Sequence, residues 1–184
     1  MNLNDVQVRR ATSDDFNDVM NVERLAFGED DEAVLVKDLL ADQTAEPYVS
    51  LLVCYQGEAI GHILFTKASL EGSNPSPSVY ILAPLAVKPE YQKQGLGGLL
   101  IREGHRILKK MGVEMVFVLG HKEYYPRHGF KGNAEAAGYP PPYPIEDIYA
   151  DCWMYQSLTS EARDIPKGKV RCADALDKPE YWRE

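Results

Sequence analysis

The arrangement of apolar and polar residues changes its period several times along the chain. Val6-Gln7-Val8-Arg9 alternates with a period of two, as a half-buried strand does, whereas Phe16, Val19, Met20 and Glu23 share one face at the helical period. The same patterns predict strands over Val6–Arg9, Val49–Tyr55, Ala59–Leu70, Val79–Val87, Val113–Leu119 and about Asp151–Gln156. They predict helices over Phe16–Phe27, Glu32–Leu40 and Leu96–Met111. This order of elements predicts an α/β domain with a mixed sheet.

Turn and cap residues support these boundaries. Thr12 and Asp15 are spaced as a capping box before the first helix, and Gly28 follows its last apolar residue. The turn Gln56-Gly57-Glu58 separates two predicted strands and indicates an antiparallel hairpin. Residues 71–78 are rich in Gly, Ser, Asn and Pro, which is typical of an exposed loop.

The strand Val79–Val87, the helix Leu96–Met111 and the strand Val113–Leu119 have the order and lengths of a βαβ unit. The second strand is continuously apolar, as strands of a parallel central sheet are, and we expect a right-handed crossover. Pro84 interrupts the first strand. Since proline cannot donate to a strand ladder, we expect a bulge or edge there, where this strand separates from its neighbour.

Between that strand and the helix lies Gln92-Lys93-Gln94-Gly95-Leu96-Gly97-Gly98, with three glycines. One glycine would be enough for a tight turn, whereas three expose backbone N–H groups close to the start of a helix, where unpaired donors and positive dipole concentrate. We therefore expect a phosphate or pyrophosphate site. A GxGxxG motif would need glycine at Leu100, and the GK[ST] ending of the Walker loop is absent, so the segment is neither of these.

Composition narrows the class of protein. The 184 residues are 45% hydrophobic and 26% charged, which is typical of a single globular domain. A net charge of −8 argues against nonspecific nucleic-acid binding and agrees with a cationic substrate. Cys54, Cys152 and Cys172 lie far apart, and no cysteines or histidines have metal-ligand spacing, so we expect a reducing cytoplasm and no metal. Neither a signal peptide nor a membrane-spanning run is expected.

Two motifs in this order resemble one enzyme family. Leu85-Ala86-Val87 followed by Gln92-x-x-Gly95-x-Gly97 is similar to the acetyl-CoA-binding motif of the GNAT superfamily of N-acetyltransferases. The run Tyr124-Tyr125-Pro126-Arg127-His128-Gly129-Phe130 resembles the tyrosine-bearing motif that follows it in those enzymes. Residues 118–127 are particularly similar to the bacterial YhbS-like group. The resemblance covers about residues 6–158.

The resemblance implies a GNAT fold, with a mixed, mostly antiparallel sheet that is splayed between strands 4 and 5 and flanked by helices on both faces. It implies one domain over residues 1–184, with a core of about 6–158 and a C-terminal extension over 159–184. Acetyl-CoA is the implied cosubstrate. Backbone groups of the first motif would pair with its pantetheine arm, and N–H groups of the glycine turn would hold its pyrophosphate. The implied cofactor-binding residues are Leu85, Ala86, Val87, Gln92, Lys93, Gln94, Gly95, Leu96, Gly97, Gly98 and Arg127.

The implied reaction is direct attack of a primary amine on the thioester in a ternary complex. The backbone N–H of Val87 would stabilise the oxyanion, and the Tyr125 phenol would protonate the departing thiolate, with Tyr124 as a packing residue. The fourth predicted strand has no carboxylate at residues 78–82, where relatives carry a general base. Glu23, on the inward face of the first helix, is the substitute, either as the base or as a structural acid, and His62 is a weaker alternative.

The acceptor is expected to be a small-molecule or peptide amine, and the protein a monomer or homodimer. The acidic run Glu29-Asp30-Asp31-Glu32 is either solvated surface or an attraction for a cationic amine. Two other functions stay open. One is a catalytically silent CoA-binding regulator, suggested by the missing strand carboxylate, and the other is an acyltransferase that uses a longer acyl-CoA.

Overall fold

The structure is a computed structural model, and it describes residues 1–159 and 164–183. Its strands are β1 (Val6–Arg10), β2 (Val49–Tyr55), β3 (Glu58–Leu70), β4 (Val79–Val87), β5 (Met115–Leu119), β6 (Trp153–Ser157) and β7 (Val170–Arg171). Its α-helices are α1 (Phe16–Phe27), α2 (Asp31–Leu40) and α3 (Leu96–Lys110). No helix among the described residues is long and apolar enough to cross a membrane.

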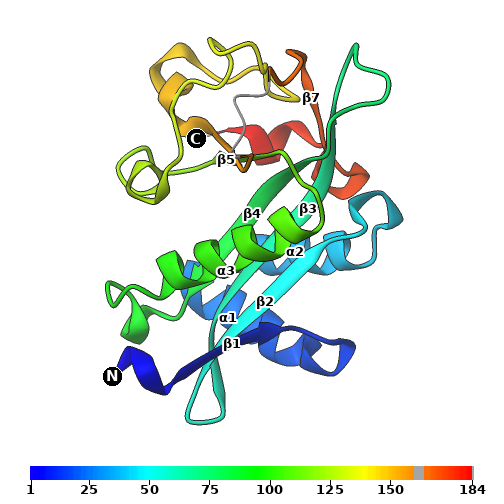
Figure 1. The fold of residues 1–184 in the computed structure, drawn as a ribbon. Coiled ribbons are helices and arrows are strands. Elements are labelled where there is room, and N and C mark those ends of the chain that lie inside the picture. The colour runs from blue at the N-terminus through cyan, green and yellow to red at the C-terminus, as the bar shows by residue number, and fades with distance from the viewer. Residues whose placement is uncertain (160–163, 184) are drawn as a thin grey trace.

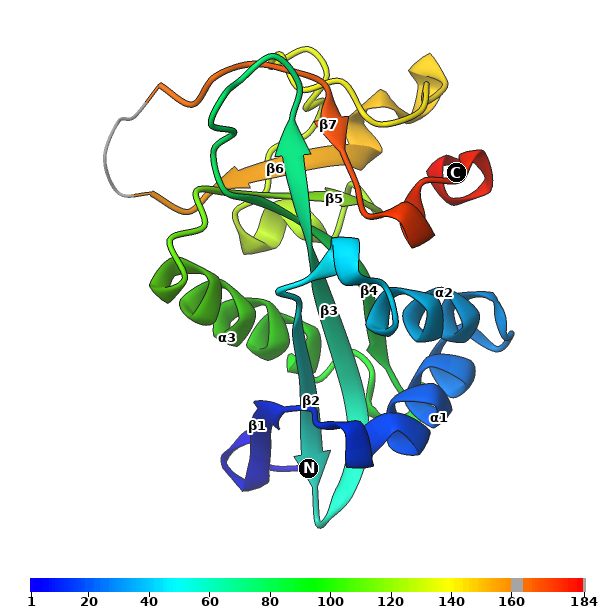
Figure 2. The same ribbon diagram turned by 90° about the vertical axis from the view of Figure 1, so that its right-hand side faces the viewer.

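One mixed sheet separates two layers of helices (Figures 1 and 2). The strand order is β1-β2-β3-β4-β5-β6, and β7 pairs with β3. Only β4 and β5 run parallel; the other pairs of described strands are antiparallel. Figure 2 shows α1 and α2 on one face of the sheet and α3 on the other. The predicted fold class is therefore confirmed, including the helices on both faces.

Each face of the sheet has its own hydrophobic core, because successive strand residues point to opposite faces. In β4, Ile81 packs into the cluster that contains Val22 of α1, and Leu82 packs into the cluster that contains Leu100 of α3. All four side chains are almost completely buried. Since burial of such a side chain is worth about 1.5–3 kcal/mol, these contacts hold the helices firmly against both faces of β4.

The sheet opens between β4 and β5. Their parallel pairing joins Val79–Ile81 to Met115–Phe117 and continues no further, although both strands run on. Beyond Ile81, the side of β4 that faced β5 has no strand partner among the described residues. The predicted separation of the fourth and fifth strands is confirmed, and it leaves one edge of β4 open within the sheet.

A β-bulge lies at Pro84, where β4 leaves its neighbour. Leu82 pairs with Phe65 of β3, and Leu85 pairs with Ile63. Two residues of β4, Ala83 and Pro84, therefore lie opposite one residue of β3. An extra residue of this kind bends a strand and interrupts its ladder. The predicted bulge is confirmed, and the missing N–H of proline falls where the ladder is already broken.

The C-terminal segment, which we define as residues 164–183, packs against the domain rather than extending as the polar tail that its composition suggests. Val170, Leu176 and Trp182 are each at most 3% exposed. The segment adds β7 to β3 and then approaches the end of α2, where the N–H groups of Asp174 and Ala175 bond to side-chain oxygens of residues 44 and 42. Burial of its apolar side chains stabilises this return path.

The other predicted elements agree with the structure except at their ends. The Thr12–Asp15 capping box is present, and Gly28 caps α1 with a φ of 75°. The fifth strand begins at Met115 and not Val113, because the N–H groups of residues 113 and 114 bond to carbonyls of residues 108 and 78. The sixth begins at Trp153, because residues 147–152 form 3₁₀ turns.

Candidate active site

The glycine turn leads directly into α3. Gly95 is the N-cap, with a φ of 87°, a conformation that glycine adopts without strain. A Cβ on Gly97 would collide with the phenol oxygen of Tyr124, and one on Gly98 would lie 2.8 Å from Cε1 of His128. A side chain at either position would therefore force Tyr124 or His128 to move. The first N–H groups of the helix, which have no intrahelical acceptor, lie beside Tyr124 and His128.

Three side chains predicted to touch a cofactor donate to backbone carbonyls of nearby residues. Nε2 of Gln92 donates to the carbonyl of Val87 at 2.9 Å, and Nε2 of Gln94 donates to that of Glu90 at 3.3 Å. The Nε of Arg127 donates to the carbonyl of residue 123 at 2.9 Å, within its own turn. Lys93 is exposed, with a φ of 60°. The bonds of Gln92 and Gln94 hold the backbone of the glycine turn in shape.

Two residues beside the turn were missed from the sequence. Nη1 of Arg102 would lie 3.2 Å from a Cβ on Gly98, and His128 touches the same glycine. Arg102 and Arg127 both lower the pKa of His128, after the larger effect of its burial. Positive charge therefore gathers at the start of α3, where the helix dipole also favours an anion. The four-residue spacing of Gly98 and Arg102, which places both on one helix face, could have indicated this role.

The open edge of β4 presents backbone groups beside this turn. The N–H of Lys88 bonds to the carbonyl of Ile60 in β3 at 2.9 Å. Since alternate residues of a strand direct their backbone groups to opposite sides, the N–H of Val87 points away from β3, toward the side that β5 has left. The N–H of Leu85 also points away from β3. By the same alternation, the N–H of Ala86, which lies opposite His62, points toward β3.

The two neighbouring tyrosines occupy different places. Tyr125, 9% exposed, opens the 3₁₀ turn Tyr125–His128 and packs edge-on against Phe130 at a ring separation of 5.6 Å. A Cβ on Gly120 would lie 2.5 Å from the Tyr125 ring, so the end of β5 passes directly beside it. Tyr124 is half-buried over Gly97, and burial raises the pKa of its phenol. The structure thus brings Tyr124 to the glycine turn and Tyr125 to the end of β5.

Glu23 and His62 form a completely buried pair between α1 and β3. Oε1 of Glu23 lies 2.6 Å from Nδ1 of His62, whose Nε2 lies 2.8 Å from Oγ of Ser50. Oε2 of Glu23 has no hydrogen-bond partner among the described residues. Burial, and to a lesser degree repulsion from Glu32, raise the pKa of Glu23, and the contact with His62 opposes them. Sequence reasoning found the inward position of Glu23 but not its partner.

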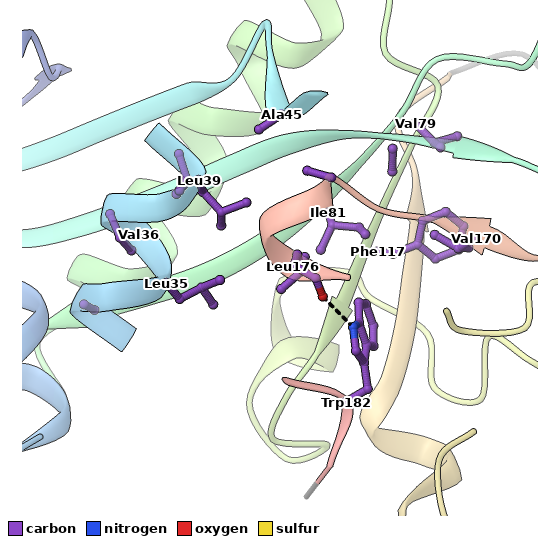
Figure 3. Close-up of a cluster of buried hydrophobic side chains, with 14 of the residues drawn as sticks. Leu35, Val36, Leu39, Ala45, Val79, Ile81, Phe117, Val170, Leu176 and Trp182 are labelled. Atoms are coloured by element: carbon purple, nitrogen blue, oxygen red, sulfur yellow. Dashed lines mark hydrogen bonds between the residues drawn. The ribbon is translucent and has the colours of Figure 1, made fainter. Parts of the chain in front are cut away.

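A cavity of about 450 Å³ opens on the α2 side of the gap between β4 and β5. Its walls come from α2, from the β4 bulge, from the end of β5 and from the C-terminal segment. The residues that line it are Asp31, Glu32, Val34, Leu35, Ile81, Leu82, Ala83, Leu119, Leu176, Glu180, Tyr181, Trp182 and Arg183. Figure 3 shows Leu35, Ile81, Leu176 and Trp182 converging from three separate parts of the chain. Glu23 does not line this cavity.

Comparison with known proteins agrees with this geometry. Residues 16–130 match the Acetyltransferase (GNAT) family. The chain is 54% identical to the uncharacterized N-acetyltransferase YjhQ of Escherichia coli K12 over 160 residues, which cover 87% of this chain and 88% of YjhQ. It is 35% identical to the uncharacterized N-acetyltransferase YhbS of the same strain over 112 residues, 59% of this chain and 63% of YhbS.

Two solved structures of acetyltransferases have the same fold over almost the whole of this chain. The structure of YhbS from Escherichia coli in complex with CoA has a TM-score of 0.83 at 26% identity, covering 94% of this chain and 92% of that one. A GNAT acetyltransferase from Brucella melitensis in complex with acetyl-CoA has a TM-score of 0.74 at 27% identity, covering 94% and 98%. Together with the sequence matches, these likenesses show that the chain belongs to the GNAT acetyltransferase family.

Proposed function

We propose that the protein transfers the acetyl group of acetyl-CoA to a primary amine, by direct attack in a ternary complex. The observation that carries this proposal is the coincidence of an opened β4 edge with a glycine turn at the start of a helix. The first offers unpaired strand groups to the amides of a pantetheine arm, and the second offers N–H donors to a pyrophosphate. Related structures hold CoA or acetyl-CoA, which supports the same donor here.

In the proposed donor site, the backbone of Leu85, Ala86 and Val87 lies along the pantetheine. The N–H groups from Gln94 to Gly98 face the pyrophosphate, and Arg102 adds positive charge beside it, next to the His128 ring. Gln92 fixes the turn through its bond to the Val87 carbonyl. We assign the same bracing role to Gln94, and we place Lys93 and Arg127 where they contribute long-range attraction to phosphate.

In the proposed reaction, the neutral amine attacks the thioester carbonyl, and the N–H of Val87 stabilises the oxyanion. Collapse of the tetrahedral intermediate breaks the C–S bond, the Tyr125 phenol protonates the sulfur, and the excess proton on nitrogen restores the phenol. Holding both reactants in one site supplies a large part of the acceleration, because it makes the step effectively unimolecular. The position of Tyr125 beside the end of β5 supports its role, since β5 has already separated from β4 before that point.

Glu23 does not reach the cavity, so we propose that it acts as a positioning residue and not as the base. Its bond to His62 joins α1 to β3 directly opposite Ala86 of β4. When the edge of β4 is fixed, the backbone groups that bind the donor stay in position. Catalysis requires this, because the reacting groups must be held in a productive geometry.

Calorimetric titration with acetyl-CoA tests the donor site, and release of CoA with a panel of amines tests transfer. Tyr125→Phe is expected to lower kcat about 10²-fold while acetyl-CoA affinity stays within threefold, because the phenol acts on the leaving thiolate. An unchanged kcat would contradict the role of Tyr125. Binding without turnover across the panel would favour a silent CoA-binding regulator instead, and competition with longer acyl-CoA molecules identifies the preferred acyl chain.

A further inference from the structure

The cavity between α2 and the C-terminal segment carries more negative than positive charge. Three carboxylates line it, those of Asp31, Glu32 and Glu180, against the single guanidinium of Arg183. The remaining lining is apolar or aromatic and includes Leu82 and Ala83 of the β4 bulge. A cavity of about 450 Å³ is large enough for a small molecule, and its lining combines apolar side chains with charged ones.

Glu32 differs from the other acids of the run 29–32. Its Oε2 is buried and has no hydrogen-bond partner among the described residues, whereas Glu29 is exposed and lies outside the cavity lining. Burial first, then the charges of Glu29 and Asp31, raise the pKa of Glu32. A buried carboxylate oxygen without a partner costs free energy, which a bound cation would recover.

The negative charge extends across the cavity to the C-terminal wall. Burial raises the pKa of Tyr181, and the charges of Asp38, Glu180, Asp31 and Glu32 raise it further, so carboxylates of both α2 and the C-terminal segment act on this ring. Nζ of Lys178 lies 6.0 Å from the same ring. One monovalent ammonium at Glu32 would leave the carboxylates of Asp31 and Glu180 without a partner on the ligand.

We propose that this cavity binds a small aliphatic amine that carries at least two positive charges, a diamine or polyamine, with its reacting nitrogen at Glu32 and a second ammonium between Asp31 and Glu180. This inference rests on the proposed function and names its acceptor class. Glu32 then replaces the strand carboxylate that β4 lacks. The C-terminal segment supplies one half of the second ammonium's site and so determines specificity.

The step balances as follows. Glu32 takes one proton from the acceptor ammonium and passes it to solvent, which leaves a neutral amine. The nitrogen forms a bond to the acetyl carbon, and the C–S bond breaks. The Tyr125 phenol protonates the sulfur of CoA, and the proton still in excess on nitrogen restores the phenol. The products are an N-acetyl amide, CoA thiol and one released proton, with no further reactant.

The test compares amines that differ only in their second group. The panel contains diamines of three to six carbons, spermidine, alkyl monoamines of the same lengths and the corresponding ω-amino acids, all with acetyl-CoA at saturation. For the wild-type protein we expect kcat/KM for the best diamine to exceed that of the matched monoamine about tenfold, and the amino acid to be poorest. The double variant Asp31→Asn/Glu180→Gln should reduce that preference to below threefold.

Glu32→Gln should lower kcat/KM about 10²-fold for every amine, with partial recovery at high pH, where more acceptor is already neutral. Glu29→Gln is the matched control, and it should stay within threefold of the wild-type protein. Equal rates for monoamine and diamine would overturn the inference, and so would a diamine preference that survives the double variant. Since Asp31 and Glu180 are exposed, the double variant also provides a test should Glu32→Gln fail to fold.

A binding measurement decides the case in which no amine is acetylated. Calorimetric titration of the diamines and spermidine into the protein saturated with CoA should show binding that the double variant loses. No binding of any of these amines overturns the inference, although binding of acetyl-CoA would still leave the donor half of the proposed function standing. Failure to bind acetyl-CoA itself would instead refute the proposed function.

Discussion

Replacement of His62 by leucine should destabilise the protein strongly, because it leaves the buried carboxyl group of Glu23 without its hydrogen-bond partner. In the folded protein, Oε1 of Glu23 is hydrogen-bonded to Nδ1 of His62, and Oε2 has no hydrogen-bond partner among the described residues. Leucine has nearly the volume of the imidazole, so the change leaves little empty space. What the variant loses is the pairing of the carboxylate and the bond to Oγ of Ser50.

The size of this loss follows from the burial of the pair. A buried carboxyl oxygen left without a partner costs about 1–3 kcal/mol, and an unpaired buried hydroxyl adds about 1 kcal/mol. Domains of this size are stable by about 5–15 kcal/mol, so His62→Leu removes a substantial part of the total. Replacing both members by leucine removes the unpaired carboxyl group, and we expect Glu23→Leu/His62→Leu to recover most of the loss.

Urea denaturation at pH 8, followed by circular dichroism, measures these differences. His105→Leu is the matched control, because His105 is also buried but has no partner for its Nε2 among the described residues. Burial lowers the pKa of His105 to about 4, so it is neutral at pH 8, and its replacement should change stability by less than about 1 kcal/mol. A loss of less than about 1 kcal/mol for His62→Leu, or a double variant no more stable than His62→Leu, would refute the reasoning.

Three further variants test other parts of the structure. At pH 5, His105→Leu should be about 2 kcal/mol more stable than the wild-type protein by urea denaturation, because the lowered pKa of His105 costs folded-state stability as the pH falls from 6.5 toward 4; equal stabilities would contradict this. Gly97→Ala should weaken acetyl-CoA binding about tenfold in calorimetry, because its Cβ collides with the neighbouring phenol, whereas Gly57→Ala, in open space, should leave binding unchanged. Trp182→Ala should lower stability by about 3–5 kcal/mol in thermal unfolding and raise the acceptor KM but not the acetyl-CoA Kd, since the ring packs on Trp153 and lines the cavity; an unchanged acceptor KM would contradict its part in the cavity.

The donor side of the molecule could be predicted because its information is local. The apolar run of β4, Pro84 and the three glycines before α3 each act through the residues next to them, and together they fixed both the opening of the sheet and the turn. Helix and strand periods gave the elements around them for the same reason. The ends of β5 and β6 were displaced by one or two residues, because single hydrogen bonds to neighbouring elements decide them.

The acceptor side depends on contacts that no local pattern records. The inward face of α1 indicated that Glu23 is buried, but its partner lies 39 residues away on another element. Glu32 could not be distinguished from three other consecutive acids, because only the folded chain shows which of them lines the cavity. In the C-terminal segment, Val170, Leu176 and Trp182 follow neither period, since they lie in three separate short elements that pack into the same core.

The bonds between the C-terminal segment and the end of α2 also bear on the order in which the protein folds. They join residues 44 and 42 to residues 174 and 175, at separations of 130 and 133 positions. Such contacts carry a large loop-closure entropy, so they form late when the elements between them can fold first. During synthesis, α3 and the glycine turn leave the ribosome before the final wall of the cavity has been made. The proposed donor site is therefore complete in the nascent chain before the proposed acceptor site, and hydrogen exchange should find residues 170–183 opening more readily than the strands beneath them.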